Sequence, residues 1–371
     1  MNDSKHPLKH PAHYLTQYLT MHLTLLLLSF MLSACSSSIK HISVYHSPDP
    51  AHMQRIIPLN SLSIQYLGVG GQLFRFGQHA IMTAPSITNP HFLLLGPFMP
   101  ISADIDMIDR YLPDVSNVES ILVGHAHYDH LMDVPYVMQN KAKNAHIYGS
   151  KTMVHSIAPA IEKPRLHALN DSMAVLKTPG QWHYNQSKTI RFMAIKSSHA
   201  PHFMGINFMT GSYQEDLESL PWHAFGWKEG QTLAYLIDFL GSQEEILHRV
   251  YYQDSASQQP LGLLPDLAAK DQKRVDIAII TPASFSQVDN YPESIMNNTR
   301  ARHFILGHWE DFFDNQEQET QRFVRSVSSH DFFKRFENAL PKNSNWTMPL
   351  LYNTQYFAPH GKILTLDQAH K

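Results

Sequence analysis

The chain has 371 residues, of which 43% are hydrophobic and 16% are charged, and its formal net charge at pH 7 is −3. This hydrophobic content is enough for a full core, and the length fits one large domain or two small ones. The nearly balanced charge gives no basic field of the kind that attracts nucleic acid, so we expect no nucleic-acid partner.

The N-terminal region has the pattern of an export signal. Lysines precede a short apolar run, residues 23–32, and the small residues Ser33 and Ala34 lead to Cys35. The apolar run is too short for a transmembrane helix. Because Cys35 is the single cysteine, no intramolecular disulfide can form.

Residues 32–35, Leu-Ser-Ala-Cys, resemble the bacterial lipobox. The resemblance implies cleavage before Cys35 and attachment of lipid to its thiol and its new amino group. By analogy with Gram-negative lipoproteins, Ser36 favours the outer membrane, with the protein facing the periplasm or the cell surface. The alternatives are ordinary secretory cleavage near Ala34 and an uncleaved anchor. The expected organisation is a signal peptide, a tether and one domain, over residues 1–34, 35–60 and 61–371.

Within the domain, strands alternate with helices. The patterns predict strands over residues 62–67, 72–76, 80–83, 120–124, 146–148, 189–195, 232–239, 248–252, 275–280 and 303–306. They predict helices over residues 105–112, 151–161, 295–302 and 317–339. This alternation indicates a layered α/β or α+β architecture.

The most informative segment follows the strand 120–124 and reads His125-Ala-His127-Tyr-Asp129-His130. In an extended chain, side chains two residues apart point to the same side, so His125 and His127 can face one ion. Asp129 and His130 can offer a carboxylate and an imidazole to a second ion. These groups suit zinc and its first-row neighbours. The alternative is a polar loop that happens to contain histidines.

Residues 124–130, Gly-His-Ala-His-Tyr-Asp-His, resemble the HxHxDH signature of the metallo-β-lactamase superfamily. The resemblance covers the chain from about residue 62 to its C-terminus. It implies an α+β fold, the four-layer αββα sandwich, with a mono- or dinuclear metal site at one edge. Members of the superfamily act on lactams, thioesters, lactones, phosphodiesters and nucleic acids, so the motif does not choose the substrate.

Three later segments, each after an apolar strand, resemble the remaining ligand positions of the superfamily. Ser-His199-Ala-Pro-His202 matches the third ligand of the first metal, and His199 is favoured over His202. Asp254 matches the bridging aspartate, although Asp-Ser-Ala-Ser can also form a helix cap or a turn. His308 matches the last ligand, and His303, at the start of its strand, is a poorer candidate.

The resemblance therefore implies a dinuclear centre. The first ion is assigned His125, His127 and His199, the second is assigned Asp129, His130 and His308, and Asp254 is shared. Zinc is the first choice for both divalent ions, with manganese, iron or mixed sites as alternatives. Two cations can clamp the attacking and leaving oxygens, and a metal-bound hydroxide then exists near neutral pH. Asp129 can also receive a proton from the water, which makes it the catalytic candidate.

Four residues near these motifs have roles that the sequence leaves open. Many superfamily members carry an aspartate where this chain has Ala84, and its absence predicts lower metal affinity or altered activity. Glu310 and Asp311 are interpreted as helix-start charges, or one of them orients His308. Tyr128 can donate a hydrogen bond to a developing oxyanion or pack against the first helix.

The segment between His199 and the strand 232–239 indicates the substrate. Residues 222–227, Trp-His-Ala-Phe-Gly-Trp, resemble a segment of N-acylphosphatidylethanolamine phospholipase D-like members. Flexible methionines and aromatic rings near a metal suit an acyl chain, or they simply pack the core. We expect a membrane-anchored metal-dependent hydrolase of a phosphodiester or phospholipid. Its partners are then a small-molecule or lipid substrate and the membrane. The alternatives are a hydrolase of a lactone, thioester or β-lactam, and a non-catalytic ligand-binding lipoprotein.

Overall fold

The computed structural model describes residues 38–48, 53, 57–58, 60–202, 204–313 and 321–364. Cys35 and the expected signal peptide lie outside these residues. Among the helices in these ranges, we find none with the length and hydropathy needed to span a bilayer.

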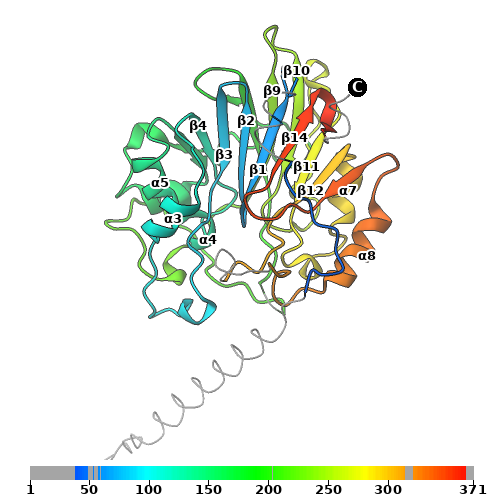
Figure 1. Cartoon of the computed structure of the whole chain (residues 1–371). Helices are drawn as coiled ribbons and strands as arrows, with labels where there is room; N and C mark the ends of the chain where they lie inside the picture. Colours follow the sequence, from blue (N-terminus) through cyan, green and yellow to red (C-terminus); the bar gives the residue numbers. More distant parts are fainter. Residues whose placement is uncertain are drawn as a thin grey trace, which may run out of the picture.

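In the described part of the chain, two mixed β-sheets pack face to face at the centre of the molecule (Figure 1). The first sheet has the strand order β15 (Lys362–Ile363), β14 (Thr354–Ala358), β1 (Leu62–Gly68), β2 (Gly71–Phe76), β3 (His79–Thr83), β4 (Val118–Leu122), β5 (His146–Gly149) and β6 (Leu166–Ala168). The second has the order β13 (Asn345–Thr347), β12 (His303–Leu306), β11 (Ile277–Ile280), β10 (Ile246–Tyr252), β9 (Leu233–Leu240), β8 (Ile190–Lys196) and β7 (His183–Tyr184).

Helices cover the outer faces of both sheets (Figure 1). On the first sheet lie α3 (Ile105–Tyr111), α4 (Tyr128–Leu131), α5 (Val134–Asn140) and α6 (Lys151–Ile157), and on the second lie α7 (Glu293–Thr299) and α8 (Ser329–Ala339). The loops contain the short 3₁₀ helices η1 (Phe92–Leu94), η2 (Lys163–Arg165), η3 (Ala224–Gly226), η4 (Ala269–Asp271), η5 (Phe285–Gln287) and η6 (Pro359–Gly361). The order helix, sheet, sheet, helix confirms the predicted α+β, four-layer αββα sandwich.

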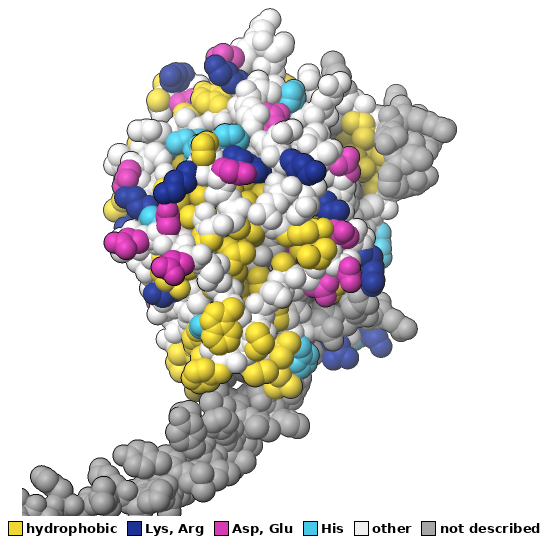
Figure 2. All heavy atoms as spheres, turned by 90° about the vertical axis from the view of Figure 1, so that its left-hand side faces the viewer, with side chains coloured by type: hydrophobic (Ala, Val, Ile, Leu, Met, Phe, Trp, Pro, Cys, Tyr) yellow, Lys and Arg dark blue, Asp and Glu magenta, His cyan; other side chains and the backbone are white. Residues whose placement is uncertain are grey.

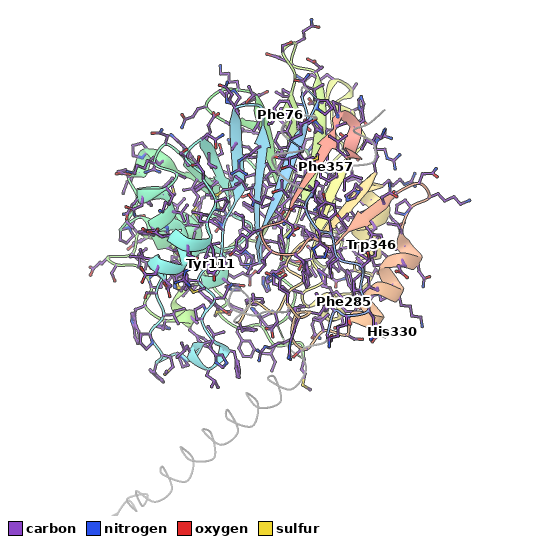
Figure 3. All side chains as sticks on the ribbon, in the orientation of Figure 1. Phe76, Tyr111, Phe285, His330, Trp346 and Phe357 are labelled. Carbon is purple, nitrogen blue, oxygen red and sulfur yellow. The ribbon has the colours of Figure 1, made fainter. Side chains whose placement is uncertain are left out.

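Apolar cores fill the spaces between the layers. Along β8, Phe192 and Ala194 belong to the core between the sheets, and Met193 and Ile195 belong to the core under α7 and α8. A strand that is covered on both faces has a continuous apolar sequence, which is why β8 could be predicted from the sequence. In Figure 3, the labelled Phe76 and Phe357 mark the central core.

The predicted helix over residues 317–339 is wrong at its start, because α8 begins at Ser329 and residues 321–328 are not helical. The Ser328 side chain accepts a hydrogen bond from the backbone N–H of Asp331 and caps the helix there. Before that cap, Phe323 pairs with Glu310 in an isolated β-bridge. This backbone pairing competes with helix formation, and the sequence pattern alone does not show it.

Residues 38–48, within the expected tether, pack on the domain. Ser38 forms a β-bridge with Arg322, and Tyr45 forms one with Pro349. Ile39 is buried in the core under α7 and α8. The apolar side chain of Ile39 gains from leaving water, so this part of the chain is held close to the fold.

Candidate metal centre

The predicted ligands approach one another because several strands end at one edge of the sandwich. β8 and β10 are both antiparallel to β9, so they run in the same direction, and β12 runs with them through β11. His199, Asp254 and His308 follow the carboxyl ends of β8, β10 and β12. The loop 123–127 of the first sheet reaches the same edge, since the Gly124 carbonyl accepts a 2.7 Å hydrogen bond from the Leu233 N–H.

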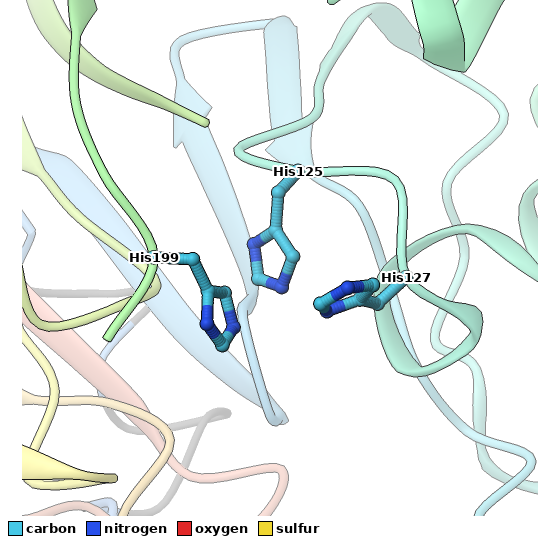
Figure 4. Close-up of side chains that lie close together, drawn as sticks. All are labelled: His125, His127 and His199. Atoms are coloured by element: carbon cyan, nitrogen blue, oxygen red, sulfur yellow. The ribbon is translucent and has the colours of Figure 1, made fainter. Parts of the chain in front are cut away.

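The first group of ligands consists of three imidazoles that face one another (Figure 4). Ring centres are 4.8 Å apart for His125 and His127, 4.6 Å for His125 and His199, and 5.0 Å for His127 and His199. One nitrogen from each of the three rings lies within 4.8 Å of the other two. Three histidine nitrogens grouped in this way are a ligand set that zinc takes.

The second group contains a carboxylate between two imidazoles. Asp129 Oδ2 is 3.6 Å from His130 Nε2 and 3.8 Å from His308 Nε2. Ligand atoms of His125, Asp129 and His130 lie within 4.8 Å of one another. His308 is the outermost member, with its ring centre 5.4 Å from that of His130.

Asp254 lies between the two groups and presents one oxygen to each. Its Oδ1 is 3.2 Å from His125 Nδ1, and its Oδ2 is 3.3 Å from His130 Nδ1. This is where a bridging carboxylate must stand. The structure thus brings together all seven residues that the sequence singled out, and their binding of metal stays a prediction. His303, the poorer candidate, instead has its Nε2 2.9 Å from Thr347 Oγ1.

The unpaired ring nitrogens in this cluster fit a bound cation. His127 Nε2, His130 Nε2 and His308 Nδ1 are buried and have no hydrogen-bond partner among the described residues. A buried polar atom without a partner is destabilising by about 1–3 kcal/mol, so a group of such atoms in one place indicates a site for a bound species. A divalent ion would use the lone pairs of His127 Nε2 and His130 Nε2.

Burial sets the protonation of the imidazoles. Desolvation, followed by repulsion from neighbouring imidazoles, lowers the pKa of His127 well below its usual value. Desolvation lowers the pKa of His199 to about 3 and that of His308 to about 4. At neutral pH these rings are therefore uncharged and have a lone pair available for a metal.

Burial acts in the opposite direction on the carboxylates. Desolvation, reinforced by the nearby charge of Asp254, raises the pKa of Asp129 to about 7. Burial also raises the pKa of Asp254. A cation placed between these carboxylates would favour their charged forms, so metal binding and loss of their protons are linked.

This linkage predicts that affinity for the ion at Asp129 falls as the pH drops below 7, by about tenfold per pH unit. The cause is the proton on Asp129, which the metal must displace, whereas His199 and His308 gain protons only near pH 3 to 4. Zinc titration calorimetry at pH 6 and pH 8, in buffers of different ionisation enthalpy, measures the protons released. At pH 6 the native protein should release about one proton more than Asp129→Asn, whereas at pH 8 only a metal-bound water can supply a proton and the two proteins should release equal numbers. Equal release by both proteins at pH 6 would contradict the raised pKa of Asp129.

The contacts of the two neighbouring histidines separate their roles. His199 Nδ1 is 2.6 Å from the Ala200 carbonyl, which can only accept, so Nδ1 carries the proton and Nε2 is free to bind metal. His202 Nδ1 instead accepts a hydrogen bond from the Phe208 N–H, 3.2 Å away. In neutral His202 the proton is then on Nε2, which makes this atom a donor rather than a ligand.

Glycines that sequence reasoning passed over make room for the cluster. A Cβ atom on Gly124 would lie 2.0 Å from Asp254 Oδ2, and one on Gly70 would lie 2.7 Å from His130 Nδ1. The Gly70 carbonyl accepts hydrogen bonds from the hydroxyls of Thr83 and Tyr252. This glycine turn therefore supports His130 from behind. Ala84, next to Thr83, is buried and adds no polar group there.

Glu310 is not a helix-start charge, because no helix follows it in the described residues up to 313. Its carboxylate is fully buried and accepts hydrogen bonds from the Val69 N–H, at 2.5 Å, and from the Tyr66 hydroxyl. The Val69 carbonyl in turn accepts a 3.0 Å hydrogen bond from the His308 N–H. Glu310 thus positions His308 through Val69. Asp311 instead pairs with Arg325 at 2.8 Å.

The aromatic residues that the sequence analysis named differ in their burial. Tyr128 is buried in the apolar core between the helices and the first sheet. Trp227 is buried in that core as well, whereas Trp222 is 55% exposed. The tryptophan-rich segment therefore contributes one ring to packing and presents the other to solvent.

Comparison with known proteins gives fold-level similarity only. No family model matches the chain, and no curated protein sequence matches it. Igni18, a metallo hydrolase from Ignicoccus hospitalis KIN4/I, is 13% identical over 80% of this chain and 98% of its own, with a TM-score of 0.47. The metallo-β-lactamase fold protein YhfI from Bacillus subtilis is 12% identical over 80% of this chain and 99% of its own, with a TM-score of 0.46.

An isothiocyanate hydrolase from Delia radicum gut bacteria is 9% identical over 80% of this chain and 99% of its own, with a TM-score of 0.47. These similarities are low, so the αββα architecture and the candidate metal centre rest on the sheet order and the side-chain geometry described above.

Proposed function

We propose that this protein is a metal-dependent hydrolase with two divalent ions held by the seven residues described above. Zinc is the first choice for both ions. The observation that carries the proposal is the convergence of His125, His127 and His199 beside Asp129 and His130, with buried ring nitrogens that lack a partner. A divalent metal held there would supply Lewis-acid activation of a water molecule and of the bond to be cleaved.

Asp129 is the proposed proton carrier. Its Oδ2 lies among the predicted ligand atoms, 3.6 Å from His130 Nε2 and 3.8 Å from His308 Nε2, so it would stand beside a water molecule held by the metal. In hydrolysis of a phosphodiester, water oxygen bonds to phosphorus and the bond from phosphorus to the leaving alcohol breaks. Asp129 takes the proton from the attacking water and returns it to the leaving oxygen.

The favoured substrate is a phosphodiester or a phospholipid. His202, proposed above as a donor on Nε2, lies with its ring centre 5.3 Å from that of His127 and can hydrogen-bond a substrate oxygen. The exposed Met204 and Ile206 lie two and four residues after His202 in the sequence and suit an acyl chain. Lactones, thioesters and β-lactams use the same activated water, and they form the second substrate class.

Turnover of bis(p-nitrophenyl) phosphate by the zinc- or manganese-loaded protein tests the proposal. We expect activity in the native protein and a loss of at least about 10³-fold in His127→Ala, which removes a ligand of the first group. His330→Ala is a matched control, because His330 is exposed on α8. Activity that survives in His127→Ala would exclude the metal centre as its source.

A panel of a lactone, a thioester and a β-lactam distinguishes the substrate classes. Hydrolysis of one of these without phosphodiester turnover would replace the favoured substrate with a carboxyl-type bond. Metal-replete protein that turns over none of them would overturn the enzyme proposal and favour a non-catalytic lipoprotein.

We also propose that Cys35 carries the lipid that anchors the protein to the cell envelope, in the outer membrane of a Gram-negative cell. The support is the lipobox-like sequence Leu-Ser-Ala-Cys35. Metabolic labelling with a lipid precursor is expected to disappear in Cys35→Ala. Labelling that persists in this variant would exclude Cys35 as the attachment site.

A further inference from the structure

Large hydrophobic side chains are exposed on loops that surround the metal centre. In the described residues, the strongest exposures are 84% for Phe98 and 76% for Met204. We call the exposed set on these loops the apolar rim, and it includes Leu93, Leu94, Phe98, Met204, Ile206 and Trp222. Figure 2 shows hydrophobic side chains gathered at the lower end of the face that it displays. A surface of this kind on one end of a protein marks an interaction site.

Backbone hydrogen bonds join two loops of the apolar rim and close the turn that carries the rest of it. The Ile101 N–H donates a 2.8 Å hydrogen bond to the Trp222 carbonyl, which places the loop 92–101 beside Trp222. Met204 and Ile206 form a turn closed by a 2.9 Å hydrogen bond from the His202 N–H to the Ile206 carbonyl. The apolar rim thus adjoins His202 at the metal centre.

The loop 92–101 also reaches His308. The ring of Phe92 lies 6.4 Å from that of Phe313, and the ring of Phe312 lies 4.9 Å from that of His308. The apolar rim and the metal centre are therefore at the same end of the molecule.

The stretches of loop that carry the apolar rim contain no charged side chain, although Glu215, Asp216 and Glu218 lie between two of them. Residues 84–103, 197–214 and 219–227 include no aspartate, glutamate, lysine or arginine, although 16% of the whole chain is charged. Moving an uncharged apolar loop into lipid is favourable, whereas each charged side chain would cost several kcal/mol. The composition therefore fits a lipid surface better than water or a charged protein partner.

The N-terminal attachment points to the same surface. The proposed lipid attachment, Cys35, precedes Ser38 by three residues, which span at most about 11 Å. Ser38 pairs with Arg322 in a β-bridge, and the guanidinium of Arg325 lies 5.0 Å from the ring centre of Phe92. A lipid on Cys35 would thus hold the bilayer close to the loop that contains Leu93 and Phe98.

We propose that the apolar rim inserts into the bilayer to which Cys35 is anchored, so that the metal centre opens onto the membrane surface. This docking rests on the proposed lipid anchor and deepens the proposed function, because it presents the centre to lipid headgroups. The bilayer is the occupant of the rim, rather than a second copy of the chain or an unprocessed N-terminal segment.

Nitroxide labels on the full-length lipidated protein, reconstituted in vesicles of phosphatidylethanolamine and phosphatidylglycerol, measure the docking. A label at Phe98→Cys is expected to be accessible to oxygen and protected from a water-soluble nickel chelate. The control is Tyr184→Cys on β7, where the native side chain is also exposed, at 43%, but lies outside the apolar rim. Its label is expected to be accessible to the chelate. Equal accessibility of both labels would overturn the proposal.

The unlipidated Cys35→Ala protein shows whether anything other than the bilayer covers the apolar rim. Without vesicles, a Phe98→Cys label in this background is expected to be accessible to the chelate. Protection there would mean that protein covers the rim, which would also overturn the proposal. With vesicles, replacing both Leu94 and Phe98 by serine should lower binding about tenfold or more, whereas Tyr184→Ser should leave it unchanged.

Turnover of the soluble phosphodiester separates this inference from the proposed function. Leu94 and Phe98 are exposed and are not among the predicted ligands, so we expect the double serine variant to retain turnover of bis(p-nitrophenyl) phosphate. Membrane insertion without turnover would leave the docking intact and reject the hydrolase. Turnover without insertion would reject the docking alone.

Discussion

Replacing Asp254 by alanine is expected to lower phosphodiester turnover by at least about 10³-fold and to release bound metal. Asp254 is the carboxylate that contacts both groups of ligands, at 3.2 Å from His125 Nδ1 and 3.3 Å from His130 Nδ1. Without it, a cation between these rings would lose both its shared ligand and the negative charge that offsets its own. Metal content by mass spectrometry and kcat measure the two effects.

The control for Asp254→Ala is Asp216→Ala, which removes a half-exposed carboxylate that pairs with Lys163 at 2.8 Å. We expect this variant to keep its metal and its activity. A more conservative change, Asp254→Asn, keeps the shape but not the charge, and it should also lose metal. Full metal occupancy and turnover in Asp254→Ala would exclude Asp254 as a bridging ligand.

Replacing His199 by alanine should remove metal together with activity, whereas replacing His202 should lower kcat by about 10² while the metal stays bound. The reason is the position of the ring protons. His199 has a free Nε2 lone pair, because its Nδ1 donates to the Ala200 carbonyl. His202 carries its proton on Nε2, because its Nδ1 accepts from the Phe208 N–H.

Metal stoichiometry measured beside kcat and KM separates these two roles. His202→Gln, which restores a side-chain N–H donor, should recover part of the activity that His202→Ala loses. The assignment would be reversed if His202→Ala lost metal and His199→Ala kept it. Loss of metal in both variants would make His202 a ligand as well.

The sequence was sufficient for the parts of the site that depend on local order. The four motif residues between His125 and His130 are neighbours in the chain, and the strand before them is an apolar run that packs on both faces. Their types and spacing are therefore readable without knowledge of the fold. The later ligands were found because each polar residue follows a buried strand and resembles a known position.

The ends of the helices and the edge strands of the sheets were harder to predict from the sequence. Short strands such as β7 and β13 take their conformation from pairing with a neighbouring strand, so their sequences show no period of their own. The predicted helix over residues 317–339 failed for a similar reason, since Phe323 pairs with Glu310 instead of continuing a helix. Tertiary pairing overrides local propensity at these places.

The sequence by itself indicated the ligands between His125 and His130 and a layered fold class, because both depend on residue type and short-range periodicity. His199, Asp254 and His308 came from the resemblance to the metallo-β-lactamase superfamily. Only the tertiary structure decided that Asp254 stands between the two groups, that Gly124 leaves room for it, and that Glu310 is a buried acceptor. It also decided that Trp227 packs inside while Trp222 faces solvent. Each of these facts is a contact between segments far apart in the chain, and such contacts arise only when the strands have paired and the two sheets have packed.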